Sequence, residues 1–417
     1  MSNPSRPSAL APFAIRSYRF QWPADLATSW AAEMETLILG WYILVQTESV
    51  LLLTLFGALQ YMGTLIAPVF GLLGDRFGHR NVLCLMRVLY AALAAILMLV
   101  TVTGQLTPTL ALVIAGLAGM VRPSDMGVRN VLIGETVPLD RLMSAVGLSR
   151  ITTDSARVAG ALAGAAVVAT LGMTWAYAIV VGLYLLSVLL TLGIAGHAKA
   201  GPGASPLARS SPFRDLRDAA RAVWESPPQL AAMLLAFLVN LTVYPFTLGL
   251  LPYAAREVYG TSQAGLGYMA ASAGLGAIAA SVIVSRMGMS VRPARMMMIG
   301  GIAWHVLVIA FGFSTSFPIG IALLAGIGLA QGMCTLPMSV LLLRGAPPAL
   351  RGRIMGMRTL AVYGLPIGLM LAGPLVDHAG FTATALVYGG GGLACALLIL
   401  RRWRAHLWPL GAPGNGG

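Results

Sequence analysis

The stretch Gly71-Leu72-Leu73-Gly74-Asp75-Arg76-Phe77-Gly78-His79-Arg80 is a short hydrophilic segment between two long apolar runs. Those runs, residues 51–73 and 82–102, are each long enough to cross a bilayer, since a spanning helix needs about 20 apolar residues. The acidic and basic residues, with a glycine among them, therefore predict a tight, charged turn at a membrane surface.

The composition extends this prediction to the whole chain. Of 417 residues, 58% are hydrophobic and 10% charged, whereas soluble proteins carry roughly 25% charged residues. We therefore expect an all-α integral membrane protein with about twelve transmembrane helices, because the ten-residue alternation of membrane barrels is missing. The expected spans are 26–46, 51–73, 82–103, 107–130, 143–169, 173–195, 230–252, 262–285, 294–314, 317–342, 354–376 and 382–401.

The net charge of +13 is explained by topology better than by nucleic-acid binding. All but three of the 27 basic residues lie in or flank every second connection or lie near the termini. The exceptions are Arg256 in an alternate connection and Arg122 and Arg157 inside expected spans. By the positive-inside rule, both termini and the central segment face the cytoplasm, in the inner membrane of a bacterium.

The opening stretch resembles the loop between the second and third helices of the major facilitator superfamily of transporters, which reads G-x-L-x-D-R-x-G-R-[KR]. His79 stands where the first arginine of the closing pair is expected. The resemblance implies two pseudo-symmetric six-helix halves with a substrate cavity at their interface, near the middle of the membrane. We expect these halves at residues 1–195 and 230–417, joined by a cytoplasmic linker, 196–229, which ends in a basic amphipathic stretch.

Matching residues in the two halves support a repeat. Asp75-Arg76-Phe77-Gly78 corresponds to Ser285-Arg286-Met287-Gly288, and Gly160, Gly172 and Thr174 correspond to Gly368, Gly380 and Thr382. The acid of the first copy is replaced by a serine in the second. A charged latch is therefore expected mainly in the first half.

Within the superfamily, the chain is similar to the proton-drug antiporters that include macrolide effluxers and the enterobactin exporter. The similarity is carried by Arg122-x-x-Asp125-x-x-x-Arg129, by the Ala145-Val-Gly-Leu-Ser149 entry to the fifth helix, and by Pro347 to Gly356. One departure is the run Gly160-Ala161-Leu162-Ala163-Gly164, which lacks the proline usual there but keeps a glycine spacing that permits close helix contact.

The resemblance implies a gating latch of opposite charges at the cytoplasmic ends of helices two to four. Such charges attract by a few kcal/mol at most at an effective dielectric near 20. Anchoring of the topology by positive charge would explain the arginines but not Asp125. His79, placed in the loop, is a candidate for pH sensitivity because imidazole titrates near neutrality. The expected latch residues are Gly74, Asp75, Arg76, Gly78, His79, Arg80, Asp125 and Arg129.

Two acids in the first span, Glu33 and Glu35, are candidates for proton coupling, since ionisable groups at membrane depth are costly and tend to be functional. Residues two apart point to nearly opposite faces, and Glu35 is preferred because its row is the more polar. Either could instead be a structural acid that pairs with an arginine. A carboxylate held against arginine with no path to the cavity would make a passive carrier the better description.

Asp154 is a further candidate for coupling and can pair with Arg157 three residues later. That pair is either structural, or one intramembrane cation receives an anionic substrate group or an exchanging carboxylate. The expected seventh span carries two prolines and is predicted to be broken. The predicted substrate cavity comprises Arg122, Arg157, Asn240, Tyr244, Gln331, Thr335 and Tyr363.

The sequence carries no phosphate-binding loop, nucleophile elbow or metal-binding cluster, which disfavours an ATP-driven pump or a membrane enzyme. We therefore expect no cofactor and no metal site. The predicted function is that of a monomeric, proton-coupled exporter of an amphipathic small molecule, a drug-like compound or a siderophore. The alternative on the same fold is a metabolite facilitator or importer, or a lysophospholipid transporter.

Overall fold

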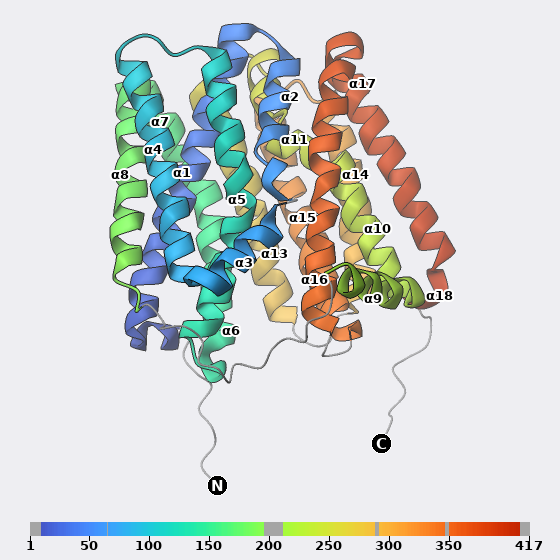
Figure 1. Ribbon diagram of the computed structural model, residues 1–417. Helices are drawn as coiled ribbons and strands as arrows, with labels where there is room; N and C mark the ends of the chain where they lie inside the picture. Colours follow the sequence, from blue (N-terminus) through green and yellow to red (C-terminus); the bar gives the residue numbers. More distant parts are fainter. Residues whose placement is uncertain (1–9, 65, 196–211, 288–291, 347–349, 409–417) are drawn as a thin grey trace. The chain divides into compact units, whose positions relative to one another are not determined.

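The computed structural model describes residues 10–64, 66–195, 212–287, 292–346 and 350–408, and these are almost entirely helical (Figure 1). The first part of the chain contains η1 (Ala11–Ala14), α1 (Arg16–Thr47), α2 (Val50–Leu59), η2 (Met62–Thr64), α3 (Ala67–Phe77), α4 (His79–Val102), α5 (Pro108–Thr136), α6 (Leu139–Ser155), the π-helical η3 (Ala156–Gly160), α7 (Ala161–Leu171) and α8 (Met173–Leu192).

The second part contains α9 (Pro212–Glu225), α10 (Pro227–Thr242), α11 (Tyr244–Leu248), α12 (Leu251–Tyr253), the π-helical η4 (Ala254–Val258), α13 (Gln263–Met287), α14 (Pro293–Phe313), α15 (Phe317–Gly345), α16 (Arg351–Leu360), η7 (Ala361–Tyr363), α17 (Gly364–Arg402) and α18 (Arg404–Leu407). The expected break of the seventh span is present, because the helix is interrupted after Thr242 and again before Leu251.

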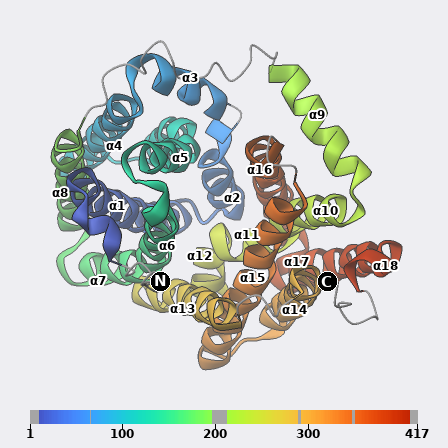
Figure 2. The same cartoon turned by 90° about the horizontal axis from the view of Figure 1, so that it is seen from below.

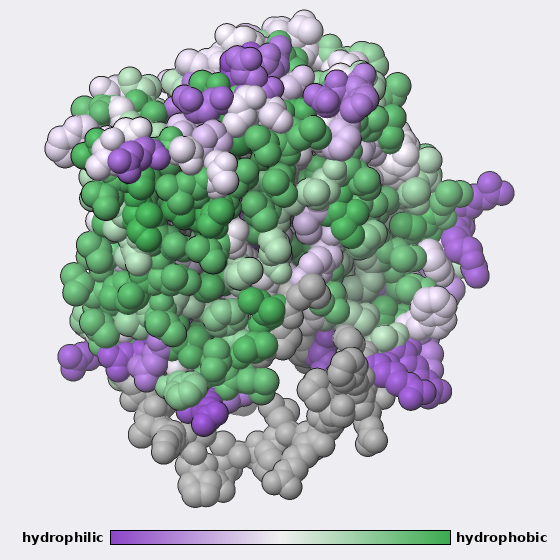
Figure 3. All heavy atoms as spheres, turned by 45° about the horizontal axis from the view of Figure 1, so that its top comes forward, coloured by the Kyte–Doolittle hydropathy of each residue, from purple (hydrophilic) through white to green (hydrophobic). Residues whose placement is uncertain are grey.

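Within the described residues, eight helical stretches are long and apolar enough to cross a membrane, or nine if the bent pair of α2 and α3 counts as one. The protein is thus a multi-pass membrane protein. On the face that Figure 3 shows, hydrophobic residues form most of the surface, and hydrophilic residues gather near the helix ends. Such an apolar surface suits contact with acyl chains rather than water.

Two spans differ from their expected form. The first helix begins at Arg16 rather than near residue 26, so that Asp25 lies inside it. The second span is bent by 49° between α2 and α3. Beside the bend, a Cβ on Gly63 would lie 1.9 Å from the carbonyl oxygen of Met120, and one on Gly119 would lie 2.1 Å from that of Leu59. The backbones therefore touch here, which only glycine permits.

The chain forms two compact units, one of Met1–Ala204 with Gly249–Gly274, the other of Ser205–Leu248 with Leu275–Gly417. In the first unit, α1 contacts α2, α5, α6, α7 and α8, and α4 packs on α5 and α8 (Figure 2). The buried core of this unit is formed by apolar residues of α1, α2, α4, α5 and α8. Helix α1 therefore makes contacts along most of its circumference.

In the second unit, α14 packs on α15 and α17, and α10 packs on α17 and α15. The amphipathic helix predicted near residues 213–225 is α9, which contacts α10 and α16 (Figure 2). The Gly201–Pro206 start of the predicted linker, Gly288 of the second loop copy and Pro347 of the eleventh-helix motif lie outside the described residues.

The predicted repeat has a counterpart in the backbone of each unit. Gly172 has φ 85° and ψ 172°, and Gly380, 208 residues later, has φ 84° and ψ 168°. Each glycine separates two consecutive helical runs in a conformation that L-residues rarely adopt. The same unusual turn therefore recurs at the predicted offset, and both segments use the same backbone conformation between their two helical runs.

The glycines of the fifth helix lie against α1. A Cβ on Gly164 would lie 3.1 Å from the Cα of Met34, and one on Gly160 would lie 3.0 Å from the Cβ of Glu33. At the repeat position, a Cβ on Gly368 would lie 2.2 Å from the carbonyl oxygen of Leu241 in α10. The glycine spacing thus serves close helix packing, as the sequence predicted.

Gly119→Ala is expected to destabilise the protein by about 1–3 kcal/mol or more, because its Cβ meets backbone atoms that cannot move aside. Gly127→Ala lies in the same helix with no atom within 4 Å of its Cβ, and is expected to be neutral or slightly stabilising. Thermal unfolding in detergent measures both, and equal melting temperatures would contradict a backbone contact between α5 and the α2–α3 bend.

Candidate functional site

The first unit contains charged side chains buried between α1, α4 and α5. On α5, Arg122, Asp125 and Arg129 follow one another at intervals of three and four residues, which places them on one face of the helix. On α1, Asp25 and Glu35 are ten residues apart, about 15 Å along the axis at 1.5 Å per residue. The two helices are in contact, and their charges meet in two separate clusters.

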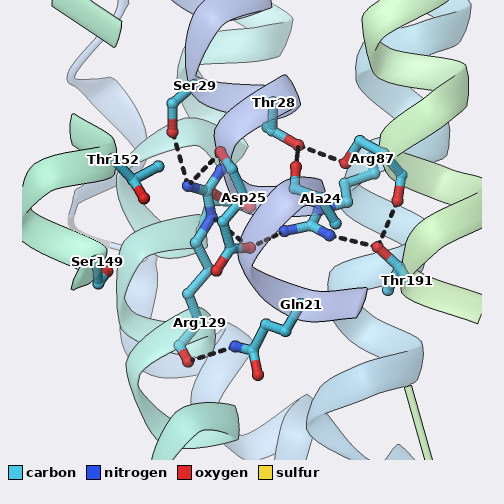
Figure 4. A network of polar contacts seen from close by, with 12 residues as sticks. Gln21, Ala24, Asp25, Thr28, Ser29, Arg87, Arg129, Ser149, Thr152 and Thr191 are labelled. Atoms are coloured by element: carbon cyan, nitrogen blue, oxygen red, sulfur yellow. Dashed lines mark hydrogen bonds and ion pairs between the residues drawn. The ribbon is translucent and has the colours of Figure 1, made fainter. Parts of the chain in front are cut away.

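The first cluster, nearer the start of α1, is built around Asp25 and is shown in Figure 4. Oδ1 of Asp25 accepts from Nη2 of Arg87 and lies 3.5 Å from Nε of Arg129. Nη2 of Arg129 lies 2.5 Å from Oδ2 of Asp125. All four of these side chains are buried, and Arg87 has no exposed surface. We call Asp25, Arg87, Asp125 and Arg129 the Asp25 cluster; its formal charges sum to zero.

Neutral polar groups add further hydrogen bonds to these arginines. Nη1 of Arg129 donates to Oγ of Ser29 at 2.9 Å, and Arg87 donates to Oγ1 of Thr191 in α8. The amide of Gln21 donates to the backbone carbonyl of Arg129 at 3.2 Å. Buried charges are tolerated only when they are paired and hydrogen-bonded. The cluster therefore joins α1, α4, α5 and α8.

The second cluster, further along α1, is built around Glu35, which is 5% exposed. Its Oε2 accepts from Nη2 of Arg122 at 2.8 Å and from the hydroxyl of Tyr184 at 3.1 Å. Nη1 of Arg122 donates to Oγ1 of Thr36 at 2.9 Å and to Oε1 of Gln60 at 2.8 Å. We call these five residues the Glu35 cluster; they come from α1, the end of α2, α5 and α8.

A small pocket of about 10 Å³ lies beside the Glu35 cluster, and its lining combines Glu35, Thr36, Gln60 and Arg122 with apolar residues. That volume is near the smallest that holds one water molecule. The cavity is too small for an organic substrate. It has room for about one water molecule beside the charged pair.

The expected latch is divided in the structure. Asp125 and Arg129 belong to the Asp25 cluster, whereas Asp75 lies 3.7 Å from Nε2 of His79. Nδ1 of the same imidazole lies 2.7 Å from Oε1 of Glu135 at the end of α5. His79 was expected in an exposed loop; this was wrong, because it is the first residue of α4 and is 7% exposed.

The glycines and arginines of the opening stretch have local roles. A Cβ on Gly74 would lie 2.4 Å from the ring of His79, and Gly78 ends α3 with φ 89°. Arg80 donates to the carbonyls of Thr191 and Leu192 at the end of α8, at 3.4 and 2.7 Å. A cation there satisfies unpaired carbonyls and the helix dipole. Arg76 lies over the ring of Phe77, 5.3 Å from its centre.

Three other predicted residues lie at the junction of α1 with the fifth helix. The Cβ of Glu33 lies against Gly160, on a different face of α1 from Glu35, as expected for residues two apart, and its carboxylate still interacts electrostatically with Arg122. Asp154 is buried in the last turn of α6, and Arg157 lies in the π-helical η3 and is half-buried. The pairing of Asp154 with Arg157 stays a prediction.

In the second unit, the predicted cavity residues form a polar row on α10, α11 and α15. Nε2 of Gln331 donates to the hydroxyl of Tyr244 at 3.3 Å, and the Tyr244 ring packs edge-on against Trp304 at 4.7 Å. Asn240 and Thr335 donate to backbone carbonyls one turn earlier in their own helices. Tyr363 is half-buried in η7. Their role in binding a substrate stays a prediction.

Sequence reasoning missed four members of these clusters. Asp25 was placed before the first span, and Arg87 was taken as a topological charge. Gln60 and Tyr184 were not singled out, although Gln60 is a polar residue inside an otherwise apolar run. The available signal was the spacing of Gln21, Asp25, Thr28 and Glu35, which continues one face of α1.

Comparison with known proteins identifies the class. A model of the Major Facilitator Superfamily matches residues 34–365 and 233–412. The chain belongs to this superfamily of membrane transporters; it is a transporter and not an enzyme.

Relatives and solved structures agree with that assignment. The multidrug efflux pump Tap of Mycolicibacterium fortuitum is 27% identical over 366 residues, 83% of this chain and 86% of that protein. The enterobactin exporter EntS of Shigella flexneri is 25% identical, over 83% of this chain and 81% of that protein. The nucleoside transporter NupG has a TM-score of 0.72 at 15% identity, covering 94% of this chain and all of that structure. A D-xylose-proton symporter has a TM-score of 0.68 at 16% identity, covering 92% and 96%.

Asp25→Asn is expected to lower the free energy of unfolding by about 3–5 kcal/mol, because it leaves two arginines without their shared buried carboxylate. Asp75→Asn removes a carboxylate that is 74% exposed, and is expected to change that free energy by at most about 1 kcal/mol. Thermal unfolding of the two variants in one detergent measures the difference. Similar melting temperatures would show that the Asp25 cluster does not hold the helices together.

Proposed function

We propose that the protein is a proton-coupled exporter of amphipathic small molecules that works by alternating access. The coarser class, a transporter of the Major Facilitator Superfamily, is given by its sequence. Export is supported by the relatives named as a multidrug efflux pump and an enterobactin exporter. The observation that carries proton coupling is the buried contact between Glu35 and Arg122.

The proposed topology has twelve spans in two halves, residues 1–195 and 230–417, with a linker at 196–229. The spans would be α1, α2 with α3, α4, α5, α6 with α7, α8, α10 with α11 and α12, α13, α14, α15, α16 with the part of α17 before Gly380, and the remainder of α17. The positive-inside distribution supports cytoplasmic termini, and the recurrence of the Gly172 turn at Gly380 supports the duplication.

The first step of the proposed coupling is that Glu35 is ionised while Arg122 contacts it. A cation within about 4 Å favours the charged form of a carboxyl group, and the hydrogen bonds from Arg122 and Tyr184 are both donated to Oε2. A proton can therefore bind only when Arg122 moves away or finds another anion. Protonation would then occur at Oε1, which these two hydrogen bonds do not use.

The second step is an exchange of partners at Glu35. A cationic group of an amphipathic substrate would compete with Arg122 for the carboxylate, while Thr36 and Gln60 hold the guanidinium. The substrate would bind more tightly to the ionised carboxyl group, and a proton taken up by Glu35 would displace it, because the neutral group no longer attracts a cation. Loss of the proton restores the ionised form, so that substrate and proton alternate at one site.

The Asp25 cluster and the group Asp75, His79 and Glu135 are proposed as the gating latch. Both join helices of the first unit, α1 with α4 and α5 in one case and α3 with α4 and α5 in the other. In this proposal, Asp75, Arg76 and Arg80 act at the end of the helices, and Asp125 and Arg129 act within them.

A second candidate is a passive facilitator or an importer. The tight contact between Glu35 and Arg122, with space for about one water beside it, also fits a pair that only holds α1 against α5. The structural neighbours include a nucleoside transporter and a proton symporter, at identities that show the fold alone. In that case the pair contributes to stability and gating, and removing its charge leaves concentrative transport intact.

Glu35→Gln is expected to abolish uphill accumulation in proteoliposomes with an imposed pH gradient, while counterflow continues, because the neutral side chain can no longer exchange a proton. Ethidium and enterobactin serve as separate probes. Glu33→Gln is the matched control on the opposite face of α1 and should retain uphill transport. If both variants accumulate the probe as the wild type does, proton coupling through the first helix is excluded.

The direction of transport is tested in inside-out membrane vesicles energised to make their interior acidic. An exporter is expected to accumulate ethidium or enterobactin inside these vesicles, and a protonophore should release it, since the gradient drives the exchange. Accumulation only in right-side-out vesicles would instead identify an importer, and equilibration without accumulation would identify a facilitator.

A further inference from the structure

A groove of about 690 Å³ lies in the second unit between α10 and the two arms of α17. Leu238 and Leu241 of α10 form one wall, Leu371 and Leu375 come from α17 before the Gly380 turn, and Gly391 and Cys395 come from the arm after it. Nearly all of its lining is apolar. Both helices belong to stretches that are apolar along their length.

The open side of this groove coincides with side chains that face outward. Leu371 is 59% exposed and Leu398, three residues beyond Cys395, is 62% exposed. A Cβ on Gly391 would have no atom of the protein within 4 Å. In a membrane-spanning segment, such a space suits hydrocarbon better than water, because Thr242, His378 and Tyr388 are the few polar residues on the lining.

Basic side chains continue the groove at one end. The row Tyr388, Gly391 and Cys395 reaches Arg402 seven residues later, on the same face and about 10 Å further along the helix. Arg401, Arg402 and Arg404 are all exposed. Helix α18 and the end of α17 lie on the same side of the unit as the start of α10 (Figure 1).

The acidic side chains described in this unit do not neutralise that end. Asp377 lies next to His378, at the opposite end of the groove, and Glu225 pairs with Arg221 at 2.8 Å. Arg402 lies 5.7 Å from the ring centre of Trp403, and Arg295 lies 5.0 Å from that of Trp408. Tryptophan and arginine together are typical of the level of lipid headgroups.

We propose that this groove is a binding site for an anionic phospholipid, with an acyl chain along Leu238, Leu371 and Gly391 and the phosphate on Arg401, Arg402 and Arg404. Under the proposed topology, the lipid comes from the cytoplasmic leaflet. Basic pockets next to apolar intramembrane surfaces suit such headgroups. The inference goes beyond the proposed export function and does not depend on it.

The test measures lipid bound to the purified full-length protein by native mass spectrometry, after addition of dioleoyl-phosphatidylglycerol or dioleoyl-phosphatidylcholine in detergent. We expect a saturable complex with phosphatidylglycerol and much weaker retention of phosphatidylcholine. Inorganic phosphate should compete poorly, since it cannot fill the groove. Equal retention of both lipids would overturn the anionic headgroup site.

Matched variants separate the two parts of the site. Gly391→Leu is expected to remove the bound lipid by filling the groove, while Gly390→Leu should keep it, because Gly390 also has open space at its Cβ but does not line the groove. Arg402→Gln should weaken binding about five-fold, on the order of one surface charge, while Arg76→Gln in the first unit should not.

Two outcomes would overturn the proposal. The first is unchanged phosphatidylglycerol binding in Gly391→Leu, since the acyl chain would then lie elsewhere. The second is a wild-type dimer that Gly391→Leu converts to a monomer without any loss of lipid, which would show that a second copy of the chain covers the groove. Melting temperatures of Gly391→Leu and Gly390→Leu check that both variants are folded.

Discussion

The contact of one carboxylate with two arginines, Asp25 with Arg87 and Arg129, governs the packing of the first unit. Each charge alone would cost several kcal/mol inside apolar helices. Each is acceptable only where the other helices present the opposite charge and a hydroxyl or amide. Helices α1, α4, α5 and α8 therefore have few alternative ways to associate, because a shift along any of them would leave a charge unpaired.

Helices α1 and α5 carry a second ion pair, Glu35 with Arg122, which lies about three turns from Asp25 along α1. The two clusters differ in what surrounds the acid. Asp25 contacts two arginines, one of which, Arg129, also pairs with Asp125, whereas Glu35 contacts a single arginine and a tyrosine. In the first arrangement, loss of one contact still leaves Asp25 with a second arginine, which suits a structural role. In the second, separation from Arg122 leaves Glu35 without a cationic partner, which suits coupling.

Much of the fold was predictable because hydropathy and glycine placement are local signals. The Gly160–Gly164 spacing, the break before Tyr244 and the Gly172–Gly380 correspondence could all be read from the residues. The sites were harder to predict from the sequence. The hydropathy of residues 16–25 does not mark them as part of the spanning helix, so Asp25 was placed before it. His79 was misplaced because a loop motif does not reveal that Glu135, 56 residues away, contacts the imidazole.

The complete burial of Arg87 bears on how the chain is inserted during synthesis. An arginine at the centre of a lone helix adds about 2.5–3.5 kcal/mol to the cost of entering the bilayer. Arg87 lies about two turns inside α4 and would carry part of that cost in an otherwise strongly apolar span. Asp25 is translated first and can offer its charge as α4 leaves the ribosome. Association of α1 with α4 would then precede the arrival of α5, which makes biogenesis a stepwise docking onto the earliest helix.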